Sequence, residues 1–172
     1  GERITVAMIP INFKLMSWGI PMANWVTIDH AATGTPLPYG IDVTPDGKVW
    51  FARLYADDMC MTDPASGSVT MIPTPFKAPR RRRTDRDGNL WIAAFNESQI
   101  ARYEPATGKF TRFDMPVLPK GSDTAYSLNV DKPRHQVWVN GTNSDSVYRF
   151  DIASKAWTFF PMSRRATFTR DV

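Results

Sequence analysis

A repeat within the sequence constrains the fold of this chain more than any other feature. Residues 38–51 (PYGIDVTPDGKVWF) match residues 79–92 (PRRRRTDRDGNLWI) at an offset of 41 residues. The same offset relates the segment 63–67 (DPASG) to the segment 104–108 (EPATG). Because a fixed period of this length marks one supersecondary unit stacked on copies of itself, the chain is predicted to be a repeat protein.

A third copy of the unit is looser. Its first strand is expected at residues 125–130, and its tryptophan, Trp138, follows Trp91 by 47 residues. The longer step reflects insertions before this copy and within its first turn, at residues 132–135.

Each copy is expected to form four short strands. Asp-Gly pairs at 46–47 and 87–88 are the two-residue signal of a tight hairpin between the first and second strands, because both positions tolerate positive φ. The second strands, at 49–51 and 90–92, are dense in aromatic and β-branched residues, as expected of strands covered on both faces. Prolines after the fourth strand end the pairing, since proline cannot donate to a ladder.

The pattern predicts an all-β fold, namely a β-propeller of four-stranded antiparallel blades with about three complete blades and partial blades at both ends. A two-sheet sandwich also contains many short strands, but the fixed 41-residue offset argues against it. Within a single partial propeller over residues 1–172, the expected parts are an outer strand of a preceding blade at 1–9, an irregular insert at 10–37, blades at 38–76, 79–116 and 124–161, and the first strand of a further blade at 165–172.

Three blades cannot close a ring, since closed propellers typically have about four blades or more. We therefore expect either that the chain is part of a longer protein or that it forms a homo-oligomer that completes the propeller. Trp50, Trp91 and Trp138 are equivalent by the repeat and are expected in the core between blades. Trp18 and Trp25 lie in the insert and could cover a pocket.

Composition and charge argue against two classes of partner, a membrane and a nucleic acid. No stretch approaches the roughly 18 consecutive apolar residues of a membrane span, so no membrane partner is expected, and the sequence specifies no compartment. The net charge of +4 comes largely from the run at residues 80–83, and basic residues do not form a stripe interleaved with exposed aromatics, which argues against nucleic acid. Cys60 is the single cysteine, which excludes an internal disulfide, and it is expected to be a buried apolar residue.

Residues 38–51, followed by Asp-Pro-Ala-Ser-Gly, resemble the repeat of the streptogramin B lyases, also called virginiamycin B lyases. The resemblance covers roughly residues 38–160, and propellers of the NHL and gluconolactonase types share parts of it. It implies a seven-bladed propeller that linearises cyclic depsipeptides by a magnesium-assisted elimination. The resemblance also implies a histidine general base, and acidic residues near the metal, at one mouth of the central channel.

Residue by residue, the resemblance does not carry lyase chemistry onto this chain. Blades of the family often read Trp-Phe-Thr-Glu, and the positions corresponding to the acid here are Arg53, Ala94 and Asn140. The family often has a histidine near the start of the first strand, where this chain has Tyr39, Arg80 and Tyr126. We therefore assign no catalytic residue, expect no cofactor in this segment, and attribute magnesium to the resemblance alone.

Other candidates for catalysis or metal binding are weak. His135 lies in the expanded turn of the third copy, where a structural role is expected. In the insert, Asp29 and His30 could form a base and its orienting partner, but adjacent residues on a strand point to opposite faces, which argues against this pair. Acidic residues show no metal-ligand spacing beyond the pair at 57–58, so no metal site is predicted.

The four arginines at 80–83 replace the residues at 39–42 of the first copy, on the innermost strand of a blade. Alternation along the strand sends them to both faces of the sheet, and a buried arginine needs an acceptor. One interpretation is an inter-blade network of ion pairs with Asp42 and Asp85. The other is an arginine wall at the channel mouth that binds an anionic group bidentately.

Two functions follow from these observations. The first is a lyase-like propeller segment, part of a metal-assisted lyase acting on a cyclic ester or peptide. The alternative is a non-catalytic ligand- or protein-binding propeller module that has lost the lyase residues. The candidate ligand-binding residues are Tyr39, Arg53, Arg80, Arg82 and Tyr126, with a small molecule or peptide as ligand.

Overall fold

The computed structural model describes residues 38–53, 56–167 and 169–172. The expected outer strand at 1–9 and the insert at 10–37, with Trp18, Trp25 and His30, lie outside the described residues. Over the described ranges the chain is built of β-strands and a 3₁₀ turn, η2 (Phe95–Glu97), and it contains no helix of the length and apolar character that a membrane crossing requires.

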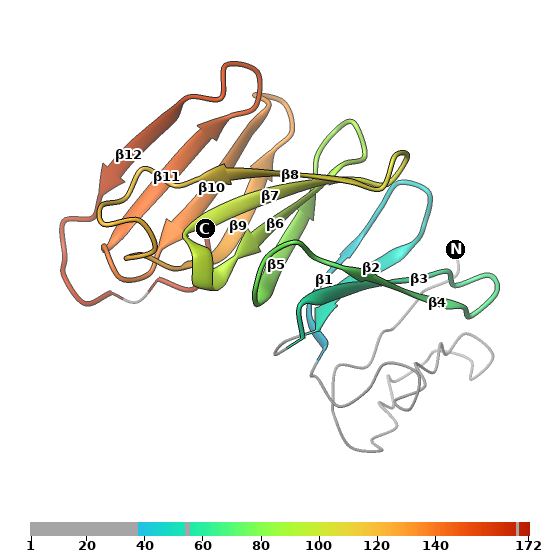
Figure 1. The fold of residues 1–172 in the computed structure, drawn as a ribbon. Helices are drawn as coiled ribbons and strands as arrows, with labels where there is room; N and C mark the ends of the chain where they lie inside the picture. The colour runs from blue at the N-terminus through green and yellow to red at the C-terminus, as the bar shows by residue number, and fades with distance from the viewer. Residues whose placement is uncertain (1–37, 54–55, 168) are drawn as a thin grey trace, which may run out of the picture.

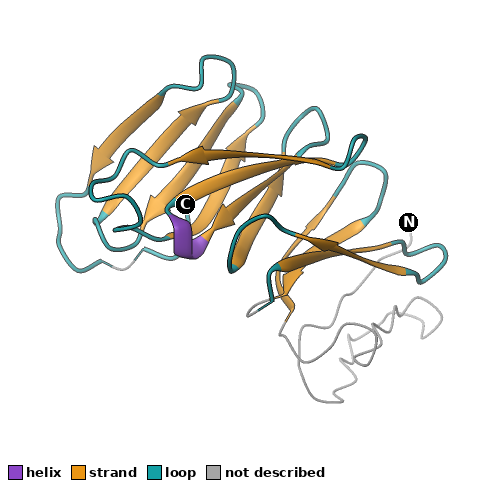
Figure 2. Ribbon diagram, in the orientation of Figure 1, coloured by secondary structure: helices purple, strands orange, loops and turns teal. Residues whose placement is uncertain are grey.

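Twelve strands form three four-stranded antiparallel sheets, each with its strands in sequence order (Figures 1 and 2). We name them blade 1, blade 2 and blade 3. Blade 1 comprises β1 (Pro38–Val43), β2 (Val49–Arg53), β3 (Asp58–Thr62) and β4 (Val69–Pro73); blade 2 comprises β5 (Pro79–Thr84), β6 (Leu90–Ala94), β7 (Gln99–Glu104) and β8 (Lys109–Asp114); blade 3 comprises β9 (Ala125–Asp131), β10 (Gln136–Gly141), β11 (Ser146–Asp151) and β12 (Trp157–Pro161). The all-β prediction and the four-stranded units are confirmed.

The blades lie side by side with their first strands innermost. β5 contacts both β1 and β9, so blade 2 lies between blades 1 and 3 (Figure 1). Across the described residues the three sheets form an open row that does not close into a ring.

The Asp-Gly hairpins form, with loops one residue longer than predicted. Thr44 N donates to Lys48 O at 3.0 Å, which leaves a three-residue loop, and Gly47 takes a φ of +82° at its last position. Asp85 N and Asn89 O close the corresponding loop of blade 2 at 2.9 Å. Glycine suits this last position because its backbone is left-handed there.

The core between the blades is aromatic. Trp50 packs against Tyr103 of blade 2, with ring centroids 5.7 Å apart, and Trp91 packs against Phe150 of blade 3 at the same separation. Both tryptophans are buried, as predicted. Trp138 occupies the equivalent position in blade 3, where it stacks on Phe160 of its own blade at 5.5 Å.

Each inner strand carries a β-bulge near its start. The register shifts by one residue between Tyr39 and Ile41, between Pro79 and Arg82, and opposite Val139 and Gly141. Such a bulge re-aims the side chains beside it. It recurs at the same place in all three blades, immediately next to the candidate site.

The expected first strand of a further blade, at residues 165–172, has no β-ladder in its described part. Side-chain hydrogen bonds hold this segment instead. Thr167 N and Oγ1 both donate to Asp145 Oδ1 at 2.7 Å, and Asp171 Oδ1 accepts from Ser127 Oγ at 2.9 Å. The assignment of this segment as the first strand of a further blade stays a prediction, because the strand that would pair with it is not among the described residues.

Candidate functional site

The starts of the three inner strands lie together on one side of the row of blades, which we call the mouth. Strand register places Pro38 opposite Arg53, Pro79 opposite Ala94, and Ala125 opposite Gly141, so the residues that follow, Tyr39, Arg80 and Tyr126, are structurally equivalent. Tyr39 OH donates to Tyr126 OH at 2.5 Å although the two residues are 87 positions apart. Three of the five candidate ligand-binding residues are thus brought together.

Arg80 lies among aromatic rings at the mouth. Its guanidinium carbon is 4.1 Å from the ring centroid of Phe95 and 5.5 Å from those of Tyr39 and Tyr126. Such cation–π contacts are worth about 0.5–1 kcal/mol each at exposed sites. Sequence reasoning missed Phe95, because it lies in the connection between β6 and β7, where the repeat carries no signal.

The hydrogen-bonding groups of Arg80 are not used by the described part of the chain. Its guanidinium forms neither an ion pair nor a hydrogen bond with a described residue, and its Nε is buried without a partner there. An arginine that is oriented by rings and keeps its donors is suited to bind an acceptor from outside.

Two further arginines and one aspartate flank this cluster. The guanidinium carbon of Arg170 is 5.6 Å from the Tyr126 ring centroid, and Arg81 Nη1 lies 2.8 Å from Asp171 Oδ2. Burial opposes ionisation of Asp171, but the Ser127 hydroxyl and Arg81 outweigh it and lower the pKa of this carboxyl. The described residues of the mouth therefore include three arginines and one carboxylate, so positive charge is in excess there.

Arg82 does not join the cluster of Arg80 and aromatic rings at the mouth. Its side chain is completely buried, its Nη2 donates to Tyr39 O at 3.0 Å, and burial lowers the pKa of its guanidinium. The predicted ion pairs with Asp42 and Asp85 do not form. Asp42 instead accepts from Thr84 N and Oγ1 at 2.6 and 2.7 Å, and Asp85 accepts from the Trp91 indole at 2.9 Å. These donors belong to residues of β5 and β6 that the strands hold in place. Bonding to them costs less side-chain entropy than ordering an arginine side chain would.

Arg53, the fifth candidate, also lies outside the cluster. It ends β2 and forms a two-bonded ion pair with Asp58 at the start of β3, with Nε to Oδ1 at 2.6 Å. Its donors are therefore satisfied within blade 1.

The register corrects one position of the sequence alignment. Gly141, not Asn140, is equivalent to Arg53 and Ala94, the positions at which the family resemblance predicts an acid. A Cβ at Gly141 would lie 2.2 Å from Asp123 Oδ2 and 2.4 Å from Ser144 Oγ, so a side chain there would require these neighbours to move. The three residues cannot hold magnesium, and the described residues contain no group of three or more acidic, histidine or cysteine side chains arranged for a metal ion.

The remaining candidates lie away from the mouth. His135 Nε2 is 3.3 Å from Asp87 Oδ2, a contact between the hairpin turns of blades 3 and 2 at the opposite end of the inner strands. Cys60 is completely buried, as predicted, and burial raises the pKa of its thiol to about 11.

Comparison with solved structures identifies the same architecture in other proteins. A streptogramin B lyase structure superposes with a TM-score of 0.69 at 20% identity, covering 78% of this chain and 43% of the lyase. The blades resemble those of the streptogramin B lyases. The virginiamycin B lyase from Staphylococcus aureus gives a TM-score of 0.67 at 20% identity, covering 76% of this chain and 43% of that one. The resemblance predicted from the sequence is thus confirmed at the level of the fold.

A second neighbour is of a different kind. YCF48 bound to D1 peptide superposes with a TM-score of 0.61 at 16% identity, covering 74% of this chain and 40% of that one. This chain therefore spans less than half the length of these proteins. No family model matches the sequence, and no curated protein does.

Proposed function

We propose that the chain is a ligand-binding segment of a β-propeller, which holds an anionic group of its ligand at the mouth and supplies no lyase chemistry of its own. The observation that carries the proposal is Arg80, whose guanidinium is oriented by three rings and forms no ion pair among the described residues.

The rings determine what Arg80 can bind. Because Phe95 lies over the guanidinium at 4.1 Å, an incoming group must approach the edge of the guanidinium plane rather than its face. Edge-on approach gives the paired N–H···O bonds that arginine forms with a carboxylate. A side chain already held in place loses less conformational entropy on binding, and Arg81 and Arg170 add positive charge beside it.

Neighbouring propellers support a small-molecule or peptide ligand. One lyase structure is that of a catalytically inactive H270A virginiamycin B lyase with quinupristin, and the YCF48 structure contains the D1 peptide. A small molecule or peptide that carries a carboxylate would place it on Arg80.

The lyase function is the second candidate, and the likeness of fold is what favours it. At Arg53, Ala94 and Gly141 this chain has no acid to offer, so any lyase activity would depend on residues beyond the described ones. A cyclic ester peptide incubated with this chain and magnesium is expected to remain cyclic, as followed by chromatographic separation of the ring-opened product.

Binding of benzoate tests the proposal. Titration followed by NMR is expected to show saturable binding to the wild-type chain and at least about tenfold weaker binding to Arg80→Gln. Arg80→Lys, which keeps the charge but loses the bidentate fork, is expected to bind with intermediate affinity. Arg86→Gln is the matched control, because Arg86 is exposed in the turn at the opposite end of β5. Equal binding by wild type and Arg80→Gln would overturn the proposal.

A further inference from the structure

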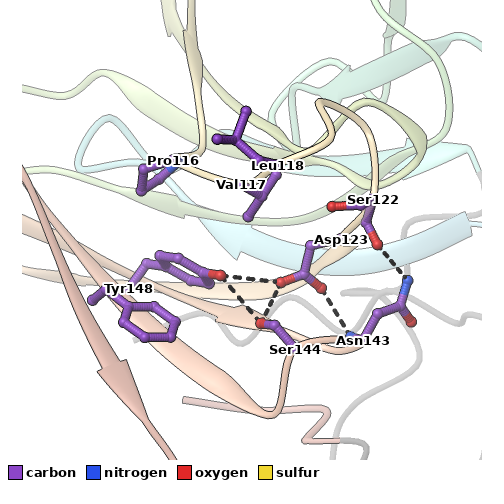
Figure 3. A pocket seen from close by; sticks show the side chains of 9 residues that line it. Pro116, Val117, Leu118, Ser122, Asp123, Asn143, Ser144 and Tyr148 are labelled. Carbon is purple, nitrogen blue, oxygen red and sulfur yellow. Dashed lines mark hydrogen bonds between the residues drawn. The ribbon is translucent and has the colours of Figure 1, made fainter.

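Blade 3 carries a hollow that is separate from the mouth. Its volume is about 300 Å³, and it lies between the connection from β8 to β9 and the connection from β10 to β11 (Figure 3). The apolar lining residues are Val117, Leu118 and Phe159, which we call the wall, and the polar ones are Asp123, Ser144 and Tyr148, which we call the floor. This volume is at the small end of the range for ligand sites, about the size for a single ring with a short substituent.

The floor contains a buried carboxylate. Asp123 is 2% exposed, and its Oδ1 accepts from the backbone N–H groups of Thr124 and Asn143 at 2.8 Å each. Its Oδ2 accepts from Ser144 Oγ at 2.5 Å and from Tyr148 OH at 3.3 Å (Figure 3). None of the described lysine, arginine or histidine side chains forms an ion pair with it. The negative charge is therefore held by hydrogen bonds alone, without a cation to balance it.

The two hydroxyl groups determine which ligands the floor can accept. Both hydrogens are committed inside the cluster, because Ser144 and Tyr148 lie 3.1 Å from each other and both reach Asp123. Burial raises the pKa of Tyr148, so its phenol stays protonated at neutral pH and keeps this arrangement. What remains on the two oxygens is lone pairs. A ligand that binds this floor must therefore bring donors, and the uncompensated charge favours a cationic donor.

The wall determines the rest of the ligand. Leu118 is 94% exposed and Phe159 is 51% exposed, and both border the hollow. Exposed apolar side chains that gather at a concave site are typical of binding surfaces. An apolar body attached to the cationic donor would cover them.

We propose that this hollow binds a small primary ammonium compound with an apolar or aromatic body, the ammonium group donating to the oxygens of Ser144 and Tyr148 above Asp123 and the body packing against Leu118 and Phe159. This site could not be predicted from the sequence, because Asp123 and Ser144 lie in two connections that the repeat does not relate. The proposal is independent of the anion site at Arg80, since the two sites use different residues and opposite charge.

Benzylammonium is the probe, and benzyl alcohol and benzoate are comparators of nearly the same shape. We expect benzylammonium to bind at least about tenfold more tightly than benzyl alcohol, with chemical-shift changes in blade 3. Added salt should weaken its binding, because the attraction is between charges. Leu118→Ala should weaken binding about threefold or more, whereas Met71→Ala, which removes a 49% exposed side chain from β4 of blade 1, should leave it unchanged.

Two outcomes would overturn this proposal. The first is equal affinity for benzylammonium and benzyl alcohol, and the second is binding that Leu118→Ala does not alter. Asp123→Asn should abolish the preference for the ammonium group. If Asp123→Asn does not fold, Tyr148→Phe replaces it as the test variant. Loss of this site with intact, Arg80-dependent binding of benzoate would reject the ammonium site alone. Failure of benzoate to bind would leave this proposal standing and reject the proposed function.

Discussion

Gly141 shows how one residue can exclude an expected chemistry. Gly141 is equivalent to the position that holds an acid in the family repeat, and it has no side chain. The side chains of Asp123, Ser144 and Tyr148 occupy the space that a side chain at Gly141 would need. The same packing that removes a possible metal ligand therefore builds the floor of the hollow in blade 3.

Gly141→Ala tests this packing directly. The added Cβ would lie 2.2 Å from Asp123 Oδ2 and 2.6 Å from Tyr148 Cε2, so neighbours must move. Overpacking of this kind typically costs about 1–3 kcal/mol. We expect the free energy of unfolding to fall by this amount in urea denaturation. An unchanged unfolding midpoint would show that the loop accommodates the side chain and that glycine is not required there.

Sequence reasoning succeeded at those residues where the repeat itself carries the information. Tyr39, Arg80 and Tyr126 could be grouped because each follows the same point of its repeat, and the structure brings them together. Phe95 could not be found, because the connection after β6 has a different sequence in every blade. Asn140 was aligned one residue away from the correct position. Arg53 and Ala94 each follow their tryptophan by three residues, and the same count from Trp138 gives Gly141, in agreement with the strand register, so this position could be predicted from the sequence.

At the scale of the strands, blades 1 and 2 are joined by hydrogen bonds between their inner strands. Asp42 on β1 accepts two hydrogen bonds from Thr84 on β5, one of them from the backbone. The sequence predicted ion pairs between the arginines at 80–83 and Asp42 and Asp85, but the composition does not determine which donor each carboxylate binds. A carboxylate beside a buried backbone N–H satisfies a group that would otherwise be costly to bury.

Asp42→Ala is predicted to weaken the contact between blades 1 and 2. Thr84 is 2% exposed, so the substitution leaves its N–H and hydroxyl buried without this acceptor. The expected loss is about 1–3 kcal/mol in the free energy of unfolding, measured in urea. Asp42→Asn keeps an acceptor oxygen and should lose clearly less, which makes it the matched control. Equal losses for the two variants would show that the acceptor is not what stabilises the interface.

At the scale of the whole molecule, the two ends of the row differ. Trp50 is covered by Tyr103 and Trp91 by Phe150, each from the next blade, whereas Trp138 and Phe160 face away from blade 2. Phe160 is 39% exposed. On the opposite end, Phe51 and Cys60 of blade 1 are already completely buried within the chain. The repeat predicts that the tryptophan of each blade packs against the next blade, but it does not predict which end of the row has exposed aromatic side chains.

This asymmetry favours one mode of self-association. Two copies that meet through the open face of blade 3 around a twofold axis would cover Phe160 in both, because each copy presents the same surface. Arg149 lies over Trp138 and Phe160 at 5.9 and 5.8 Å and partly covers them, and the two arginines would approach each other in the pair. The association is therefore expected to be weak and to strengthen with salt, which screens that repulsion.

Sedimentation velocity over a range of concentrations tests this mode. The wild-type chain is expected to shift from monomer toward dimer as its concentration rises, because the pair would bury the exposed ring of Phe160. Phe160→Lys should remain monomeric, since it would add two positive charges to a contact that already contains both copies of Arg149. Met71→Lys, which changes a comparably exposed side chain on the outer strand of blade 1, should associate like the wild type. A wild-type chain that stays monomeric at high concentration and high salt would contradict the twofold contact.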